Sequence, residues 1–253
     1  MDFVLTSDLD WSSDYCIENF LAIAARFSIT PTVFVTHESA AIGKAAEKGR
    51  VELGIHPNFL PPSTHGDSFE SILAHVLGLV PKPVAVRCHR YIAGPAIERM
   101  LAERGLRIDS NTCRHLECGL APVDLPSGLL RLPVFFEDDF HWMQGMTWRF
   151  TDHAPAFFSP GLKILNFHPF FVALNIPDAT FYSRHKPHIP TLAADDASRC
   201  RHRGKGSRTF LIEALTAIRA AGHGFVTLGE LAKSLGLRAP ARRIADAAVP
   251  EGA

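Results

Sequence analysis

Two aspartates, Asp8 and Asp10, follow the apolar run Phe3–Leu5 in the stretch FVLTSDLDW near the start of the chain. In an extended strand, side chains two residues apart point to the same side, so both carboxylates would project from one strand end into one space. Two close carboxylates repel each other unless a cation lies between them or one takes up a proton. The pair therefore indicates a site that holds a metal ion, or a histidine or arginine partner.

Further polar side chains follow the other predicted strands, each at the point where an apolar run ends. They are His56 after VELGI, Arg87, His89 and Arg90 after PVAV, Asp109 and Ser110 after GLRI, Glu137, Asp138 and Asp139 after LPVFF, and His168 after KILNF. In parallel α/β folds the carboxyl ends of the strands share one edge, and active sites are built there. The pattern predicts one active site at that edge.

The elements that must position these residues alternate along the chain. Short β-branched or apolar runs predict strands at 3–5, 32–36, 51–55, 84–86, 106–108, 132–136, 164–167 and 225–227, and helical periodicity predicts helices at 15–27, 40–48, 69–80, 96–104, 209–221 and 228–235. Such repeated units imply a parallel sheet with helices outside, either a barrel or an open sheet. We expect one catalytic domain over 1–237 and a frayed tail over 238–253.

Composition narrows the class of protein. The 253 residues carry no formal net charge, so nothing global suggests nucleic acid or a membrane surface as a partner. The start lacks the basic and apolar regions of a signal peptide, and no apolar run approaches the length of a membrane span. Five scattered cysteines are typical of reduced thiols in a cytosolic protein.

The ordered motifs resemble the polysaccharide deacetylases with the NodB-type catalytic domain, over nearly the whole chain from Phe3 to about Leu235. The similar stretches are TSDLDW, PTVFV, VELGIHPN, RCHRY, GLRIDSNT, ILNFHPF and GFVTLGEL. The resemblance implies a distorted (β/α)7–8 barrel and a metal-dependent carbohydrate esterase. The most similar branch is cytosolic and associated with bacterial surface-polysaccharide (O-antigen) synthesis.

The resemblance also implies roles for individual residues. Asp8 would be the general base, Arg87 would hold Asp8 ionised, and His168 would protonate the leaving amine. Asp10 and His56 would bind a divalent metal, most simply Zn²⁺, with Co, Ni, Mn or Fe as other options.

The sequence departs from the family pattern in two places. Leu9 separates the two aspartates, and the second ligand histidine is missing from its usual position, which holds Phe59 or Leu60. The next histidine is His65, beyond two prolines that could fold the loop back, and we predict it as the third ligand.

Other features suggest where a substrate would bind. His89 and Arg90 could hold a sugar hydroxyl or a carboxylate, and Asp138, Asp139 and Trp142 together form a candidate sugar-binding rim; a solvated acidic loop is the alternative. Cys113, His115 and Cys118 could form a separate metal cluster, although their spacing is not that of a standard zinc site.

The segment 184–208 concentrates cations and closes with Gly204-Lys205-Gly206-Ser207-Arg208 directly before a predicted helix. Glycines let a backbone approach a ligand closely, and a helix N-terminus attracts anions. Arg208 is therefore a candidate phosphate ligand for a nucleotide- or lipid-linked sugar, and a solvated loop is the alternative.

These observations together predict a metal-dependent hydrolase that removes an N-acetyl or related acyl group from an amino sugar in the cytoplasm. Two alternatives stay open: a metal-dependent amidohydrolase on a non-sugar C–N bond, and a sugar-binding protein without activity. Retention of Asp8 beside Asp10 argues against the second, because binding alone needs no base. The sequence does not give the sugar, the acyl group or the oligomeric state.

Overall fold

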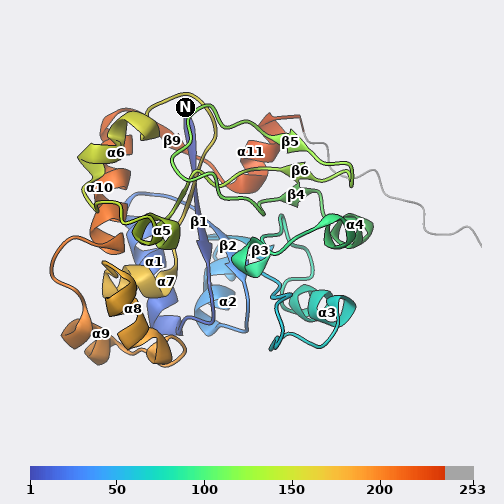
Figure 1. Ribbon diagram of the computed structural model, residues 1–253, viewed down its shortest axis with the longest axis horizontal. Helices are drawn as coiled ribbons and strands as arrows, with labels where there is room; N and C mark the ends of the chain where they lie inside the picture. Colours follow the sequence, from blue (N-terminus) through green and yellow to red (C-terminus); the bar gives the residue numbers. More distant parts are fainter. Residues whose placement is uncertain (237–253) are drawn as a thin grey trace, which may run out of the picture.

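A parallel sheet with β1 (Asp2–Asp8) at its centre forms the core of the computed structural model, which describes residues 1–236 (Figure 1). Its strand order is β3-β2-β1-β8-β7, and β9 also pairs with the start of β1. The partners are β2 (Thr32–Val35), β3 (Glu52–Ile55), β7 (Phe136–Glu137), β8 (Lys163–Asn166) and β9 (Gly224–Phe225). The predicted frayed tail, 238–253, lies outside the described residues.

A second set of short strands links the two edges of this sheet. Here β4 (Ile108–Asp109) pairs in parallel with β6 (Leu130–Arg131), which pairs antiparallel with β5 (Val123–Asp124). Val86 bridges Ile55 of β3 and Asp109 of β4, and the continuous stretch 130–137 reaches β4 through β6 and β8 through β7. The pairings therefore form a ring, which confirms the predicted distorted (β/α) barrel. The strand predicted at 84–86 forms a short parallel pairing with β3, with backbone hydrogen bonds from Val84 N–H to Leu53 and from Ile55 N–H to Ala85.

Helices cover the outside of this ring. The predicted long helices are present as α1 (Asp14–Arg26), α2 (Ala40–Glu47), α3 (Phe69–Leu79), α4 (Pro95–Glu103), α10 (Ser207–Ala220) and α11 (Leu228–Ser234). Short ones not predicted from the sequence are η1 (His89–Tyr91), α5 (Asp138–Met143), α6 (Phe150–Phe157), α7 (Pro169–Leu174), α8 (Ala179–His185), η2 (Lys186–His188) and α9 (Ala194–Cys200). In Figure 1, α3 and α4 lie on one side of β1, and α6, α8, α9 and α10 on the other.

The core fixes the strands on both sides. Residues Phe3 to Asp8 of β1 are all buried. On one side a phenylalanine-rich cluster packs β1 and β7 against α10, with the rings of Phe136 and Phe210 stacked at 4.7 Å. On the other, aliphatic side chains of α2, α3 and α4 pack on β2 and β3. Packing of this kind makes the strand ends a rigid platform for functional side chains. None of the described helices is both long enough and apolar enough to cross a membrane.

Candidate active site

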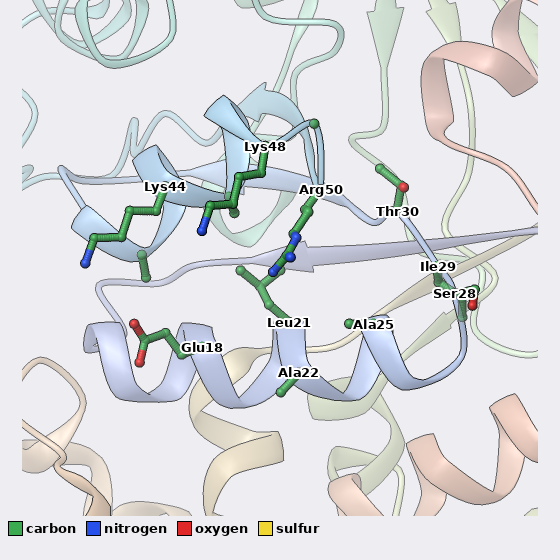
Figure 2. A pocket seen from close by; sticks show the side chains of 13 residues that line it. Glu18, Leu21, Ala22, Ala25, Ser28, Ile29, Thr30, Lys44, Lys48 and Arg50 are labelled. Atoms are coloured by element: carbon green, nitrogen blue, oxygen red, sulfur yellow. The ribbon is translucent and has the colours of Figure 1, made fainter.

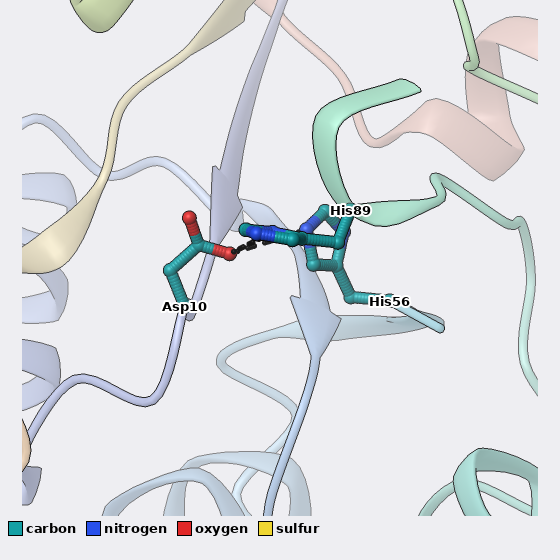
Figure 3. Close-up of side chains that lie close together, drawn as sticks. All are labelled: Asp10, His56 and His89. Atoms are coloured by element: carbon teal, nitrogen blue, oxygen red, sulfur yellow. Dashed lines mark hydrogen bonds and ion pairs between the residues drawn. The ribbon is translucent and has the colours of Figure 1, made fainter. Parts of the chain in front are cut away.

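Asp10, His56 and His89 converge just beyond the carboxyl ends of the barrel strands (Figure 3). Oδ1 of Asp10 lies 3.2 Å from Nε2 of His56 and 3.1 Å from Nδ1 of His89. Burial alone would raise the pKa of Asp10, but the contacts with His56 and His89 hold it well below its usual value. Asp10 is therefore an ionised carboxylate that faces two imidazoles.

These three side chains fit a divalent metal ion. One carboxylate oxygen and two imidazole nitrogens lie within 4.8 Å of one another. Zn²⁺ and similar ions prefer such donors, and catalytic sites commonly use three protein ligands with a further position open. The second ring nitrogen of His56, Nδ1, is buried and lacks a hydrogen-bond partner among the described residues. The chemistry of the donor set supports a metal site here.

His65, the predicted third ligand, lies outside this group, which contains His89 instead. Nδ1 of His65 accepts a hydrogen bond from the backbone N–H of Asn58 at 3.1 Å, and its ring stacks on His75 at 5.0 Å. The ring of Trp11 lies beside both histidines, 5.5 Å from His65 and 5.2 Å from His89. The loop after β3 thus holds His65 in a histidine stack, and His89 approaches Asp10 from η1.

Asp8 is in a different environment from Asp10. Nη1 of the fully buried Arg87 lies 2.8 Å from Oδ1 of Asp8, and Nδ2 of Asn166 donates to Oδ2 at 3.0 Å. Arg87 is itself fixed by Ser110 and Thr6. Burial would raise the pKa of Asp8, but the Arg87 charge lowers it below its usual value. The structure therefore brings together the predicted base and arginine.

His168 is oriented by a carboxylate behind it. Its Nδ1 lies 2.7 Å from Oδ1 of Asp138, whose other oxygen accepts from the hydroxyl of Ser207 at 2.7 Å. Pro169 begins α7 directly after His168, because proline favours the first helical position. Burial would lower the pKa of His168, but Asp138 raises it well above its usual value. Nε2 lies 3.6 Å from Oδ2 of Asp10, so the ring's free edge faces the group formed by Asp10, His56 and His89.

The sequence predictions did not include Tyr91 and Asn166, which both contact Glu137 at this edge. Glu137 accepts hydrogen bonds from the hydroxyl of Tyr91 and from the amide of Asn166. Burial and the neighbouring Asp139 raise the pKa of Glu137 well above its usual value, and burial raises the pKa of Asp139 to about 6. Asn166 ends β8 and Tyr91 directly follows His89 and Arg90, and this position beside predicted site residues is the signal that could have identified them.

The backbone is strained at this site. Among non-glycine residues of the described chain, positive φ angles occur at Asp10 (42°), Trp11 (57°), Arg90 (54°) and Tyr91 (58°), as well as at three positions elsewhere. Non-glycine residues adopt this conformation rarely, and strain of this kind concentrates at functional sites. The strained turns aim Asp10 and η1 toward each other.

A cleft of about 550 Å³ opens over these groups. Its walls include Asp8, Asp10, His56 and His168, together with the predicted substrate residues His89, Arg90, Asp139 and Trp142. A larger hollow of about 660 Å³ lies between α1 and α2, but its lining is mainly apolar with Lys44, Lys48 and Arg50 at its rim (Figure 2). The lining of that hollow contains no histidine and only one carboxylate. The cleft is therefore the better candidate for an active site.

Two predicted substrate residues lie elsewhere. Asp138 is fully buried behind His168 and does not form a rim. Arg208 donates to Asn19 of α1 and is not part of the cleft. The glycine before its helix has a packing role, because a Cβ at Gly206 would lie 2.3 Å from the carbonyl oxygen of Asn175.

The structure also gives no support to two other predicted sites, the phosphate site before α10 and the cysteine–histidine metal cluster. The N–H groups of Ser207 and Thr209 at the start of α10 are bonded within the chain, so the structure gives no support to a phosphate site there. Cys113, His115 and Cys118 do not converge as metal ligands within the described part of the chain; His115 bonds His141 instead.

The chain also matches a known protein family. A family model for WbmS-like polysaccharide deacetylases matches residues 5–186. The chain belongs to this family. The matched residues include Asp8, Asp10, His56, Arg87 and His168. No curated protein matches the sequence.

Solved structures show how widely the fold is shared. WbmS from Bordetella bronchiseptica, assigned as a polysaccharide deacetylase involved in O-antigen biosynthesis, is 28% identical with a TM-score of 0.78, over 85% of this chain and 90% of that one. A peptidoglycan N-acetylglucosamine deacetylase is 14% identical (TM-score 0.52; 90% and 86% covered). A 4-α-glucanotransferase from Thermococcus litoralis is 10% identical (TM-score 0.51; 92% and 38% covered). Since the last carries out a different reaction, the fold alone does not define the chemistry.

Proposed function

We propose that this protein is a metal-dependent deacetylase that removes an N-acetyl or related acyl group from an amino sugar during synthesis of an O-antigen-type polysaccharide. The observation that carries the proposal is that three separate groups of side chains, suited to three different roles, lie at one edge of the barrel. Asp10 faces two histidines, Asp8 pairs with Arg87, and His168 pairs with Asp138. The WbmS-like family and its O-antigen relative support the substrate class.

Asp10, His56 and His89 would hold the metal. A bound divalent ion, Zn²⁺ or one of Co, Ni, Mn and Fe, would polarise the amide carbonyl and make water a better nucleophile. Asp8 lies beside this group and accepts the proton of the attacking water. Arg87 and Asn166 keep the Asp8 carboxylate ionised and fix its direction.

His168 supplies the second proton transfer. An amine leaves poorly unless its nitrogen is protonated, so an acid must stand on the leaving-group side. The Asp138 contact fixes Nδ1 and leaves Nε2 directed into the cleft, and the raised pKa keeps a proton on the ring near neutral pH. The aromatic side chains of the cleft give a surface for a sugar ring. The proposal places the enzyme in the cytoplasm, where activated amino sugars are made.

The test combines metal content with product release. Purified protein is stripped with a chelator, reloaded with single divalent ions, and incubated with a panel of N-acetylated amino sugars and simple non-sugar acetamides. We expect acetate to be released from the amino sugars only. The release should return when metal is added back to the stripped protein, and it should be absent in Asp8→Asn. Release from the non-sugar amides alone would favour a different amidohydrolase. Tight sugar binding without acetate from any metal-loaded sample would favour a binding protein.

A further inference from the structure

An aromatic wall lines the cleft beside His168. We define it as Trp142, Phe171 and Tyr182, all of which line the cleft. The ring of Phe171 lies 5.1 Å from that of His168, and the ring of Tyr182 lies 5.0 Å from Phe171 and 6.0 Å from Trp142. The wall therefore extends from the proton donor toward α8, and it offers flat apolar surface to a sugar ring.

Lys186 stands at the end of this wall. It follows Tyr182 by one helical turn, at the junction of α8 and η2, and its Nζ lies 5.9 Å from the centre of the Tyr182 ring. It lines the main cleft and also an adjoining hollow of about 240 Å³ that shares Asp10, His89 and His168. The ammonium group thus lies where two parts of the substrate space meet.

Arg90 contributes a second cation to the same cleft, from η1. Neither Arg90 nor Lys186 forms an ion pair with a described residue, although Glu137 and Asp139 line the same cleft. Both side chains are exposed, so solvent screens them and a bound anion would be recognised by contact rather than by long-range attraction.

Three other cations of the segment 184–208 are engaged outside the cleft. Arg199 pairs with Asp196, Lys205 with Glu213, and Arg201 bonds the carbonyl of Ala173. Among the described residues, Lys186 is the member of this segment that lines the cleft. Lys186 therefore differs from these three cations, because it lines the cleft and forms no ion pair with a described residue.

We propose that Lys186 and Arg90 bind an anionic oxygen group of the substrate, a sugar carboxylate or a sugar phosphate, while the sugar ring packs on the aromatic wall. The inference rests on the proposed function and adds the substrate class. A guanidinium can hold a carboxylate or phosphate through two parallel hydrogen bonds, and an ammonium acts as a point charge. Such contacts discriminate an acidic sugar from its neutral counterpart.

The experiment measures binding rather than turnover, so that it is independent of the deacetylase test. Zinc-loaded Asp8→Asn protein, in which the base is absent, is titrated calorimetrically with three matched probes: N-acetylglucosamine, its 6-carboxylate, and its 1-phosphate. We expect at least one anion to bind about tenfold more tightly than the neutral sugar, a difference typical of one charge-assisted hydrogen bond. The favoured anion identifies a carboxylate or a phosphate as the ligand.

Two variants and a control assign the effect to residues. Lys186→Gln and Arg90→Gln, added to the same background, should each remove most of the preference and change the Kd of the neutral sugar by less than about twofold. The control is Lys205→Gln, which removes a cation of the same segment that is paired with Glu213. The preference should survive there, and should shrink as salt is raised in the parent.

The inference is overturned if neither anion binds measurably, if both anions bind like the neutral sugar, or if the preference survives both Lys186→Gln and Arg90→Gln. Acetate release by the parent protein is measured separately. Release without an anion preference would retain the deacetylase and reject the acidic substrate. An anion preference without acetate release from any substrate would retain the anion site and reject the deacetylase.

Discussion

Asn166 donates a hydrogen bond from Nδ2 to Oδ2 of Asp8 at 3.0 Å. The same nitrogen lies 3.1 Å from Oε1 of Glu137, so one amide bridges two buried carboxyl groups. Its oxygen accepts from Nη1 of Arg87 at 2.7 Å. The direction of the proposed base therefore depends on a residue that does not take part in proton transfer.

Asn166→Ala should slow turnover more than it weakens substrate binding. The change leaves Asp8 and Glu137 without their shared donor, and we expect kcat to fall at least about tenfold with little change in KM. Leaving buried groups unsatisfied should also lower the free energy of unfolding by roughly 1–3 kcal/mol. Acetate-release kinetics and urea unfolding measure both effects. Asn19→Ala, on α1 outside the cleft, is the matched control, and an unchanged kcat in Asn166→Ala would reject the role.

Substitutions of the two strand-end aspartates should have different effects on metal binding and turnover. Asp10→Ala removes a proposed ligand, so the purified protein should lose most of its bound metal. Asp8→Asn keeps the shape of the side chain and should retain the metal, but kcat should fall by about 10²–10⁴ because the base is gone. Elemental analysis after dialysis and acetate release separate the two outcomes. Equal loss of metal in both variants would show that the roles are not divided.

The choice of third ligand can be tested with a pair of histidine variants. His89 contacts the same Asp10 oxygen as His56, and His65 is held by Asn58 in a stack with His75. We expect His89→Ala to weaken metal affinity by about 10-fold or more, and His65→Ala to change it by much less. Competition with a chromogenic chelator gives both constants. A greater loss in His65→Ala would restore the assignment made from the sequence.

Much of the fold was predictable because local pattern and global topology agree. Apolar runs such as Phe3–Leu5 end at polar residues, and parallel strands must bring those ends to one edge. This reasoning predicts from the sequence alone that Asp8, Asp10, His56 and His168 lie together. The same reasoning missed the short helices α5 to α9, since elements of six to eight residues give too few turns for a clear periodicity.

The third ligand and the role of the cationic segment could not be predicted from the sequence, because residue spacing does not determine how a loop runs in space. His65 and His89 both follow a strand end in sequence, and sequence spacing does not reveal the positive φ angles at Asp10 and Arg90, where the chain turns beside the site. The sequence predicts that Gly206 approaches an anion, but in the structure its lack of a Cβ makes room for the carbonyl oxygen of Asn175. The sequence does not distinguish Lys186 from the other cations of its segment, whereas the structure places it in the cleft beside the aromatic wall.

Asp138→Asn tests whether Asp138 acts through His168. Asp138 holds Nδ1 of His168 at 2.7 Å and raises the pKa of that ring. Without the charge, the pKa of His168 should fall, so the limb of the kcat profile that declines at high pH should move to lower pH. We expect kcat at neutral pH to drop about 10²-fold. Ser207→Ala, which removes only the hydroxyl behind Asp138, is the milder comparison, and a merely structural role would leave the profile in place.

A neutral histidine pair below the site should make the fold sensitive to acid. Nε2 of His115 and Nδ1 of His141 lie 3.1 Å apart, and Nε2 of His141 donates to the carbonyl of Thr147 at 2.8 Å. Burial lowers the pKa of His141 to about 4, and burial with the neighbouring His141 lowers that of His115 to about 3. Both rings therefore stay neutral in the folded protein at pH values where they are charged in the unfolded chain.

The sign of the pH dependence follows from this difference. Below an unfolded pKa of about 6.5 the unfolded chain binds more protons, so stability contributed by the pair is present above that pH and is lost as the pH falls toward 4. The loss should be at most about 1.4 kcal/mol per pH unit for each histidine, and less for the partly exposed His115. His141→Gln keeps a donor for Thr147 and should flatten the decline; His188→Gln, an exposed histidine of η2, should not.

Urea unfolding between pH 7 and about 4.5 gives the slopes. Asp139 titrates in the same range with the opposite sign, because its raised pKa of about 6 lets the folded protein bind a proton before the unfolded chain does. The informative quantity is therefore the difference in slope between His141→Gln and the parent, in which the Asp139 contribution cancels. Parallel slopes for the parent, His141→Gln and His188→Gln would show that the pair carries its proton in the folded state or contributes nothing to acid sensitivity.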